Sequence, residues 1–577
     1  MHLTDFARRT LEDRYMIPSD VLPEDVFIRA VKEYTEGTFR ERMLQYVEDQ
    51  WFIPSTPVLA NAGTTRGNPI ACFLNRVPDS RGGITGHYTE TSWLASNGGG
   101  VGGYWGFLRS LGQKTSSGSQ SNGMIPFLGV VDRLVLAFAQ GGTRRASYAG
   151  FLPVSHPEIV NFIEMRKPTG GDINRKCLNL HHGVCVSDLF MQCVDNNASW
   201  GLVDPHTKQV VETVNARVLW EAILETRMLT GEPYIVFSDN LNDQRPSILK
   251  TLGVPVYSSN LCTEITVATQ MPDNSEATGV CCLGSINAAK YDEFRDSPLF
   301  IKDCLRYLDN VLQSFIDGES VGDDLAKRSA EYYRDVGLGV LGWHSLCQSK
   351  MYPLSSALAF GLNNRLFKWL RTQADSANID LADERGPCPA ARDAGEHKRF
   401  THMLAVAPNA STSIFTNTSP GIEPYVANAY IRKTASGTTV EKNPYLVPVL
   451  KAHGLDTEEV WTDIAINNGS VQHLVQLDEY TRDVFKTAFE MGQLVLVEQA
   501  ALRGQFIDQG QSLNLFFAPG TSRKYYGKVH REAHRKGLKT LYYLRPLAAH
   551  KASTGQVVHA IVQDTSDMDS ECLACAN

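Results

Sequence analysis

Three side chains that could act together on a small polar substrate occupy alternate positions of one short segment. They are Asn260, Cys262 and Glu264. In an extended strand alternate side chains project to the same face, so an amide, a thiol and a carboxylate would converge on one small volume. The segment is also typical of a turn at a strand end with a buried cysteine. Local chemistry leaves both interpretations open.

Two more cysteines, Cys572 and Cys575, lie close to the end of the chain. The residues from Asp564 onward are small and acidic, which favours a mobile tail. A Cys-x-x-Cys pair on such a tail could exchange thiols with a disulfide elsewhere. The alternative is half of a zinc site, because His550 and His559 lie upstream, although structural zinc needs four closely paired ligands.

The chain contains twelve cysteines, and its first residues lack the apolar core of a signal peptide. We therefore expect a cytoplasmic protein without a static disulfide framework. The apolar runs are too short to cross a membrane. Six cysteines are expected to be small buried hydrophobic residues: Cys177, Cys185, Cys193, Cys304, Cys347 and Cys388.

The elements that position these groups can be predicted from periodicity. Apolar residues from Val26 to Tyr34 recur at helical spacing, so residues 1–50 are expected to form short helices. The stretch Ser96–Asn122 is rich in glycine and serine and predicts ligand-facing loops. A dinucleotide-binding reading of Gly98–Gly103 is weak, because no strand precedes it and no acidic ribose ligand follows.

From residue 125 to 510 the pattern alternates between strands and helices. Gly183–Val186 and Met403–Val406 are typical of strands, whereas Val218–Leu229 is typical of a helix. This alternation favours an α/β fold, and 577 residues with 43% hydrophobic content can bury a large core. The net charge of −8 offers no basic surface for a nucleic acid polymer.

Beyond these local features, Asn260-Leu-Cys-Thr-Glu-Ile resembles the active-site strand of class I ribonucleotide reductase large subunits. Five further segments match that family in the same order along nearly the whole chain. They are Ser55-Thr-Pro through Asn61-Ala-Gly to Ala71-Cys-Phe-Leu, Val280-Cys-Cys-Leu-Gly-Ser-Ile-Asn, Pro408-Asn-Ala-Ser-Thr-Ser with Gly421-Ile-Glu-Pro-Tyr, Lys539-Thr-Leu-Tyr-Tyr, and Cys572-Leu-Ala-Cys.

The resemblance implies a ten-stranded α/β barrel with the radical cysteine on a central finger loop. It implies a short N-terminal helical region over 1–54, the barrel over 55–545 and a flexible redox-active tail over 546–577. Family members often begin with an ATP-binding helical domain of about a hundred residues. The 54 residues before Ser55 are too few for that domain, so no overall activity switch is expected.

The resemblance also implies a reaction, in which ribonucleoside diphosphates are reduced to 2′-deoxyribonucleotides for DNA synthesis. Cys262, as a thiyl radical, would remove the 3′-hydrogen, Glu264 would take the 3′-hydroxyl proton, and Asn260 would hold the hydroxyls. Cys72 and Cys281 would supply two electrons and end as a disulfide.

Cys282 also lies in the motif of the second reducing cysteine. The family commonly has Cys-Asn-Leu there, which favours Cys281 and puts Cys282 in the usual place of the asparagine. The spent disulfide would be reduced by Cys572 and Cys575, which thioredoxin or glutaredoxin would then reset.

The resemblance assigns binding residues as well. Those for the substrate are Thr56, Ala71, Gly100, Asn409, Ala410, Ser411, Thr412 and Ser413. Asp79 and Arg109 match the site of a nucleoside triphosphate specificity effector, bound with Mg²⁺ near the interface of a large-subunit homodimer.

Adjacent tyrosines are by themselves typical of packing, but Tyr542 and Tyr543 match the radical-transfer pair of the family. A phenol can lose an electron and a proton together, which allows stepwise transfer over long distances. The pair implies a small partner subunit with a dinuclear metal and radical cofactor, and no metal in this chain. It argues against a cobalamin-dependent class II enzyme. No C-terminal glycyl loop of a class III enzyme is found, and the intact cysteines argue against a silent nucleotide-binding paralogue.

Overall fold

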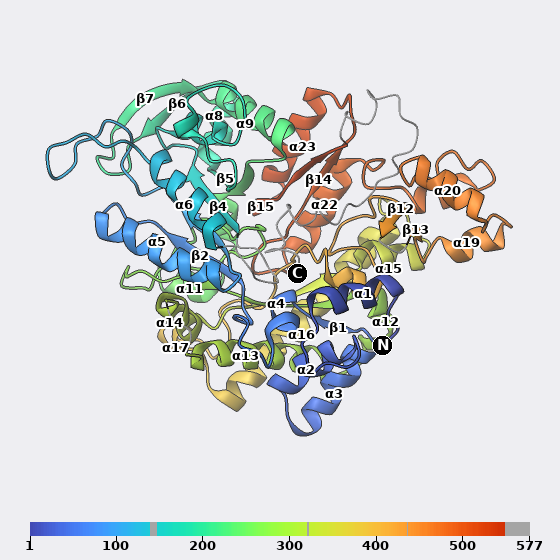
Figure 1. Ribbon diagram of the computed structural model, residues 1–577. Coiled ribbons are helices and arrows are strands. Elements are labelled where there is room, and N and C mark those ends of the chain that lie inside the picture. Colours follow the sequence, from blue (N-terminus) through green and yellow to red (C-terminus); the bar gives the residue numbers. More distant parts are fainter. Residues whose placement is uncertain (139–146, 320–321, 435–436, 548–577) are drawn as a thin grey trace.

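The computed structural model describes residues 1–138, 147–319, 322–434 and 437–547 (Figure 1). The predicted redox pair Cys572 and Cys575, and the two upstream histidines of the zinc alternative, lie outside these ranges. Within them, no helix is both long enough and apolar enough to pass through a membrane.

Most strands belong to two halves of a barrel that face a shared interior, while β6 with β7 and β12 with β13 form separate two-stranded sheets. Their bounds are β1 Phe52–Pro54, β2 Cys72–Arg76, β3 Gly100–Tyr104, β4 Ser147–Pro153, β5 His181–Val186, β6 Ser199–Val203, β7 Val210–Asn215, β8 Tyr234–Phe237, β9 Gly279–Val280, β10 Cys282–Asn287, β11 Val336–Leu341, β12 Ala429–Thr434, β13 Gly437–Lys442, β14 Leu515–Phe517, β15 Thr540–Leu541 and β16 Leu544–Pro546.

The first half is a seven-stranded sheet in the order β15-β8-β5-β4-β3-β2-β9, in which β2, β3, β4, β5 and β8 are parallel. The second half begins with β1, β10 and β11 and continues through parallel bridges from Leu338 to Leu404 and from Val406 to Gln511. The parallel pair β14 and β16 extends it.

The chain passes between the halves at two places that matter for chemistry. Cys281 alone separates β9 from β10, and Tyr542 with Tyr543 separates β15 from β16. The predicted α/β barrel is therefore confirmed, although its strands belong to several short sheets rather than one continuous ladder.

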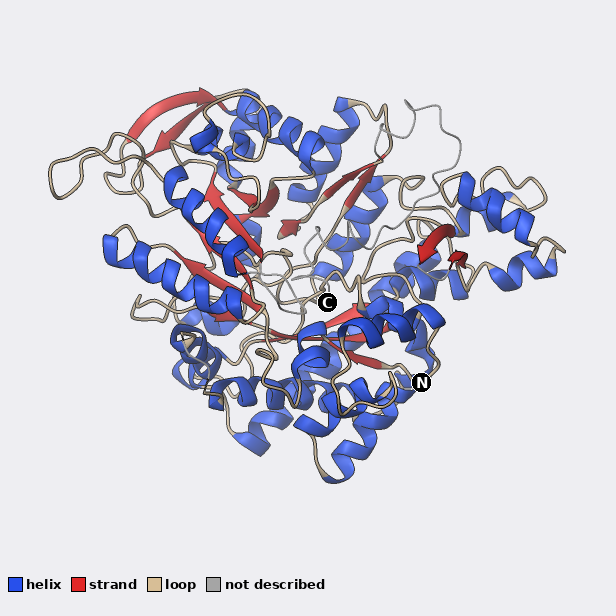
Figure 2. Ribbon diagram, in the orientation of Figure 1, coloured by secondary structure: helices blue, strands red, loops and turns tan. Residues whose placement is uncertain are grey.

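Helices cover the outside of this barrel, while the strands of the main sheets lie inside (Figure 2). Their bounds are α1 Asp5–Arg14, α2 Asp25–Tyr34, α3 Gly37–Glu48, α4 Thr56–Asn61, α5 Arg81–Ser96, α6 Ile125–Phe138, α7 Ile159–Glu164, α8 Asp188–Asp195, α9 Ala216–Thr230, α10 Ser238–Asp243, α11 Ser247–Thr251, α12 Tyr291–Phe294, α13 Phe300–Asp317, α14 Asp324–Tyr333, α15 Trp343–Ser349, α16 Ala357–Arg385, α17 Pro389–Asp393, α18 Thr412–Thr416, α19 Val447–Ala452, α20 Glu458–Ile466, α21 Glu479–Val484, α22 Gln493–Gly504 and α23 Arg523–Arg535, with short 3-10 turns at Ile173–Arg175 and Ala288–Lys290.

The predicted N-terminal helices are α1, α2 and α3, which pack beneath the second half of the barrel. The apolar face of α2 is buried, as its spacing predicts. Tyr307 of α13 donates a 2.8 Å hydrogen bond to the carbonyl of Ala30, and Arg42 of α3 forms a 2.6 Å ion pair with Asp303. These contacts attach the helical region to the barrel.

The finger loop, which passes through the middle of the barrel, carries Asn260, Cys262 and Glu264, all buried. Of the two interpretations left open by the sequence, the turn with a buried cysteine is confirmed and the extended strand is not, because the chain reverses at the tip. Thr263 has φ of 66°, and its N–H donates to the carbonyl of Asn260 at 3.2 Å. The Asn260 N–H in turn donates to the carbonyl of Ile265 at 3.2 Å. The loop satisfies these groups within itself, where a lone strand would lack a pairing partner.

Glycines on opposite sides allow this loop to fit. A Cβ at Gly102 of β3 would lie 2.2 Å from the carbonyl oxygen of Ser259, and one at Gly510 would lie 2.6 Å from that of Thr263. The prediction that Ser96–Asn122 is loop throughout is therefore wrong at β3. Glycine is a poor strand former, but here the bare backbone is needed for close approach.

We predict that Gly102→Ala lowers the free energy of unfolding by about 1–3 kcal/mol, because the new methyl group must displace buried backbone. Thermal melting of the two proteins measures this. The control is Gly129→Ala in α6, where a Cβ meets nothing within 4 Å. That change should stabilise the helix slightly. Equal melting of Gly102→Ala and the parent protein would contradict the close contact.

Candidate active site

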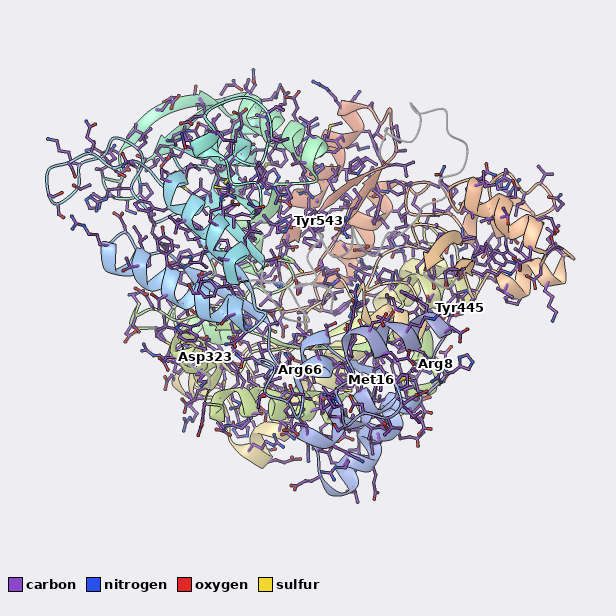
Figure 3. All side chains as sticks on the ribbon, in the orientation of Figure 1. Arg8, Met16, Arg66, Asp323, Tyr445 and Tyr543 are labelled. Carbon is purple, nitrogen blue, oxygen red and sulfur yellow. The ribbon has the colours of Figure 1, made fainter. Side chains whose placement is uncertain are left out.

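Cys262 sits at the buried tip of the finger loop, next to the two adjacent tyrosines. The hydroxyl of Tyr542 lies 3.6 Å from the Cys262 sulfur, and the rings of Tyr542 and Tyr543 have centroids 4.3 Å apart. Figure 3 places Tyr543 near the middle of the molecule, where the two halves meet. The Tyr543 N–H donates to the side chain of Asn514 at 3.1 Å. The three groups form a continuous line of contacts ending at the thiol.

The other two loop residues lie beside Cys262 even though the loop is not a strand. The hydroxyl of Ser512 lies 2.6 Å from the carbonyl oxygen of Cys262 and 3.2 Å from the Glu264 carboxylate. Asn260 accepts a 3.1 Å bond from the N–H of Ile265 through Oδ1. Its Nδ2 is buried and has no hydrogen-bond partner among the residues that the structure describes. That amide is a donor available to a ligand.

Cys72 and Cys281 lie opposite each other where β2 meets β9. The strands are antiparallel with Phe73 opposite Val280, which puts Cys281 across from Cys72, and the Cys281 N–H donates to the Cys72 carbonyl at 3.4 Å. Facing residues of such a pair have Cα atoms about 4.5–5.5 Å apart. That spacing lies within the range a disulfide needs. Neither cysteine forms a disulfide among the described residues.

Cys282 faces the other way, because neighbouring residues of a strand alternate in direction. It belongs to the main hydrophobic core, whereas Cys72 and Cys281 share a small cluster with Ile265 of the finger loop.

Burial raises the pKa of the Cys281 thiol well above its usual range, although a 3.6 Å hydrogen bond from the Gln509 amide opposes the shift. Cys281 is therefore a protonated thiol, able to give a hydrogen.

The predicted phosphate loop lies at the end of the second half of the barrel. Asn409 has a positive φ of 55°, and its Nδ2 lies 2.9 Å from the Ser285 hydroxyl and 3.1 Å from that of Thr412. The short helix α18 begins at Thr412. Asn409, Ser411, Thr412 and Ser413 are all buried or nearly so. The loop is a fixed turn that presents small side chains and hydroxyls.

The remaining predicted substrate residues lie on the two halves near their junction. Thr56 begins α4 and is buried, and Tyr15 donates to its hydroxyl at 3.4 Å. The carbonyl of Ala71 accepts a 2.7 Å bond from the Gly100 N–H. Ala71 precedes Cys72 directly, so these backbones flank the predicted reducing pair.

Asp79 and Arg109 are brought together, but away from the finger loop. Their side chains form a 2.9 Å ion pair, and Arg109 also donates to the carbonyl of Lys114 at 2.7 Å. His206 lies 3.6 Å from the Asp79 carboxylate. In the described contacts neither residue touches the groups around Cys262, so they mark a separate polar surface.

Sequence reasoning missed the polar residues that support the site from 508 to 514. Gln509, Ser512 and Asn514 contact Cys281, Glu264 and Tyr543 respectively. A signal was present in the sequence, since Asp-Gln-Gly-Gln-Ser-Leu-Asn is a polar run directly before the apolar strand β14. A polar run before a strand is typical of residues that line an active site, but it is equally typical of an ordinary loop.

Lys539 supports the same segment from behind. Its ammonium group donates to the carbonyls of Ile507, Asp508 and Gln509 at 2.9, 2.8 and 2.8 Å. Burial lowers the pKa of Lys539 to about 8. The side chain therefore acts as a cross-link between β15 and the polar run.

These features define a barrel enzyme with a buried cysteine on a finger loop, a second pair of thiols and a tyrosine pair. The family model for the ribonucleotide reductase barrel domain matches residues 70–394 and 391–544, and that for the ribonucleotide reductase all-alpha domain matches residues 1–67.

Similar proteins point to the same family as the two family models. A putative ribonucleoside-diphosphate reductase large subunit of Frog virus 3 (isolate Goorha) is 43% identical over 93% of this chain and 92% of its own length. That of Invertebrate iridescent virus 3 is 36% identical over 98% and 97%. The Actinobacillus ureae class Id ribonucleotide reductase alpha subunit superposes with a TM-score of 0.82 at 31% identity, covering 96% of this chain and 98% of that one. The chain belongs to the ribonucleotide reductase large-subunit family.

Glu423, in the segment after the phosphate loop, is a buried acid whose charge should change near neutral pH. Asn514 donates to its carboxylate at 2.6 Å. Burial raises the pKa of Glu423 to about 7, against the opposing charge of Arg545 and that hydrogen bond. A folded-state pKa above the unfolded value means that stability is lost as the pH rises from about 4.5 to 7.

We predict that Glu423→Gln melts at a higher temperature than the parent protein at pH 8, and that this advantage shrinks at pH 5. Between pH 5 and pH 8 the difference in free energy of unfolding between variant and parent should change by at most about 3 kcal/mol, from the size of the pKa shift. Glu12→Gln on the exposed side of α1 serves as the control and should give the same difference at both pH values. A pH-independent effect of Glu423→Gln would rule out the shifted acid.

Proposed function

We propose that this chain reduces ribonucleoside diphosphates to 2′-deoxyribonucleotides by thiyl-radical chemistry. The observation that carries the proposal is the contact of the Tyr542 hydroxyl with the Cys262 sulfur at 3.6 Å, on a loop bordered by Cys72 and Cys281. A hydrogen atom can pass between the two atoms with little movement. The diphosphate substrate is supported by the printed names of the viral relatives.

In the proposed reaction Cys262, as a thiyl radical, removes the 3′-hydrogen of the ribose. Glu264 takes the 3′-hydroxyl proton as general base, and the buried Nδ2 of Asn260 holds a hydroxyl. The 2′-hydroxyl leaves as water. Cys72 and Cys281 give two electrons and two hydrogens and become a disulfide, after which the 3′-hydrogen returns from Cys262. One water and one disulfide form for each deoxyribonucleotide.

Substrate binding is assigned to the junction of the two halves. The phosphates would contact the turn at Asn409, Ala410, Ser411, Thr412 and Ser413, and the ribose side would contact Thr56, Ala71 and Gly100. Support comes from the ordered Asn409 turn and from the nearness of Ala71 and Gly100 to the reducing pair.

Large subunits of this family work with a small subunit that holds the metal cofactor, and we propose that Tyr543 and Tyr542 receive an oxidising equivalent from it. The tail pair Cys572 and Cys575 would reduce the active-site disulfide and be reset by thioredoxin or glutaredoxin.

The proposed division of the chain is a helical region over 1–54, the catalytic barrel over 55–545 and the redox-active tail over 546–577.

The polar surface at Asp79 and Arg109 is the proposed site of a nucleoside triphosphate effector with Mg²⁺. Arg109 could pair with phosphate when its ion pair with Asp79 opens. We place this site near the interface of a homodimer, in a protein of the cytoplasm.

Cys262→Ser should abolish reduction of ribonucleoside diphosphates while effector binding is retained, because a serine hydroxyl cannot carry the radical. The assay uses the large subunit with and without its metal-loaded small subunit, and effector binding is measured by calorimetry. Substantial turnover by Cys262→Ser would disprove the proposed radical site. Turnover by Tyr543→Phe with adenosylcobalamin and no small subunit would instead indicate class II chemistry.

Cys281→Ser and Cys282→Ser form a matched pair, since the two cysteines are adjacent in the chain and both are buried. We expect Cys281→Ser to lose catalytic turnover by at least about 100-fold and Cys282→Ser to retain most of it. Deoxyribonucleotide formed per enzyme, with a chemical dithiol as reductant, gives the measurement. The reverse result would assign the second reductant to Cys282.

A further inference from the structure

Radical transfer through Tyr543, which is part of the proposed function, poses a question about protons. A neutral phenol that loses an electron becomes a very strong acid, so its proton must go to a nearby base as the electron leaves. The inner tyrosine has the Cys262 sulfur beside its hydroxyl. The outer tyrosine needs a different acceptor.

A histidine of the first half of the barrel contacts the Tyr543 hydroxyl and is itself paired with a glutamate. His181 Nδ1 lies 3.2 Å from the Tyr543 oxygen and 2.6 Å from Glu232 Oε1. The pair results from strand register. β5 and β8 are parallel with Gly183 opposite Tyr234, so the residues two positions before these, His181 and Glu232, lie side by side.

Glu232 is held firmly in this position. The N–H and Nδ1 of His182 each lie 3.1 Å from Oε2, and the Arg166 guanidinium lies 3.6 Å from Oε1. Only 2% of the Glu232 side chain is exposed. Burial favours the neutral acid, but the pairing of Glu232 with His181 and Arg166 outweighs it and holds the pKa of Glu232 well below its usual range. The carboxylate is thus a fixed base.

Aromatic packing fixes the ring of His181 against the tyrosines. Tyr234 stacks on it with centroids 6.1 Å apart and an interplanar angle of 17°. The same Tyr234 ring packs against Tyr542 at 5.0 Å and Tyr543 at 5.1 Å. The imidazole therefore has little freedom to leave the Tyr543 hydroxyl.

We propose that the His181–Glu232 pair is the proton acceptor for Tyr543 during radical transfer. One electron leaves Tyr543 for the oxidant of the small subunit, and the phenol proton moves to Nδ1. The proton that Nδ1 shared across the 2.6 Å contact moves to Oε1 of Glu232. Starting from a neutral imidazole and a carboxylate, the products are a neutral tyrosyl radical, a neutral imidazole and a protonated carboxyl group, so the one proton lost by the phenol is gained by Glu232. The same two protons return when Tyr543 is reduced.

The test begins with His181→Phe in the large subunit, assayed with its small subunit. We expect turnover to fall by about 100-fold, the size of a lost acid–base group, with unchanged binding of substrate and effector. Glu232→Gln should reduce turnover comparably, because an amide cannot take the proton. The matched control is His473→Phe, which breaks a similar 2.7 Å pair with Asp463 on α20. That control should keep full turnover.

A second measurement separates proton acceptance from packing. Tyr543 is replaced by a fluorinated tyrosine whose phenol is ionised at the assay pH, so no proton has to leave. In that background His181→Phe should cost less than about 3-fold in turnover. The proposal is overturned if His181→Phe or Glu232→Gln retains full turnover with the natural tyrosine. It is equally overturned if the loss is as large with the ionised phenol.

These results are distinct from a failure of the proposed function. If Tyr543→Phe itself keeps full turnover with the small subunit, radical transfer does not use Tyr543, and the proposal fails together with that step. If Tyr543→Phe is inactive while His181→Phe is fully active, only the His181–Glu232 assignment is wrong.

Discussion

The fit of the finger loop between the two halves of the barrel is the constraint on which the site depends. Within the described ranges the loop pairs with no strand, so its backbone is satisfied by its own turn and by the surrounding walls. Gly102 on one side and Gly510 on the other allow the walls to approach the loop backbone directly. Cys262 is consequently placed by main-chain contacts, which are stiffer than those of side chains.

The two crossings between the halves place the other reactive groups around that loop. Cys281 lies between β9 and β10, and the tyrosines lie between β15 and β16. At these points the chain leaves one half of the barrel and enters the other. The residues at both crossings contact the finger loop: Tyr542 at Cys262, and Cys281 in the cluster with Ile265. The thiol pair and the tyrosine pair therefore reach Cys262 from different strands of one framework.

Buried polar groups beside the tyrosines complete this framework. Asn514 joins the backbone of Tyr543 to the carboxylate of Glu423, and His181, paired with Glu232, contacts the Tyr543 hydroxyl. Such groups are costly to bury unless they are paired. Their concentration around one tyrosine suits a residue that exchanges charge with its surroundings.

The sequence alone determined the kinds of residue, their order along the chain and the alternation of strands and helices, because these are local properties. The barrel was implied by the resemblance of the motifs to a known family. Tertiary structure decided the rest, since strand register and close packing join residues far apart in the chain. Register put Cys281 opposite Cys72 and turned Cys282 into the core. Packing bent the Cys262 segment into a turn and made β3 out of a glycine-rich stretch. His181 and Glu232 are 51 residues apart and meet only because β5 and β8 are neighbours.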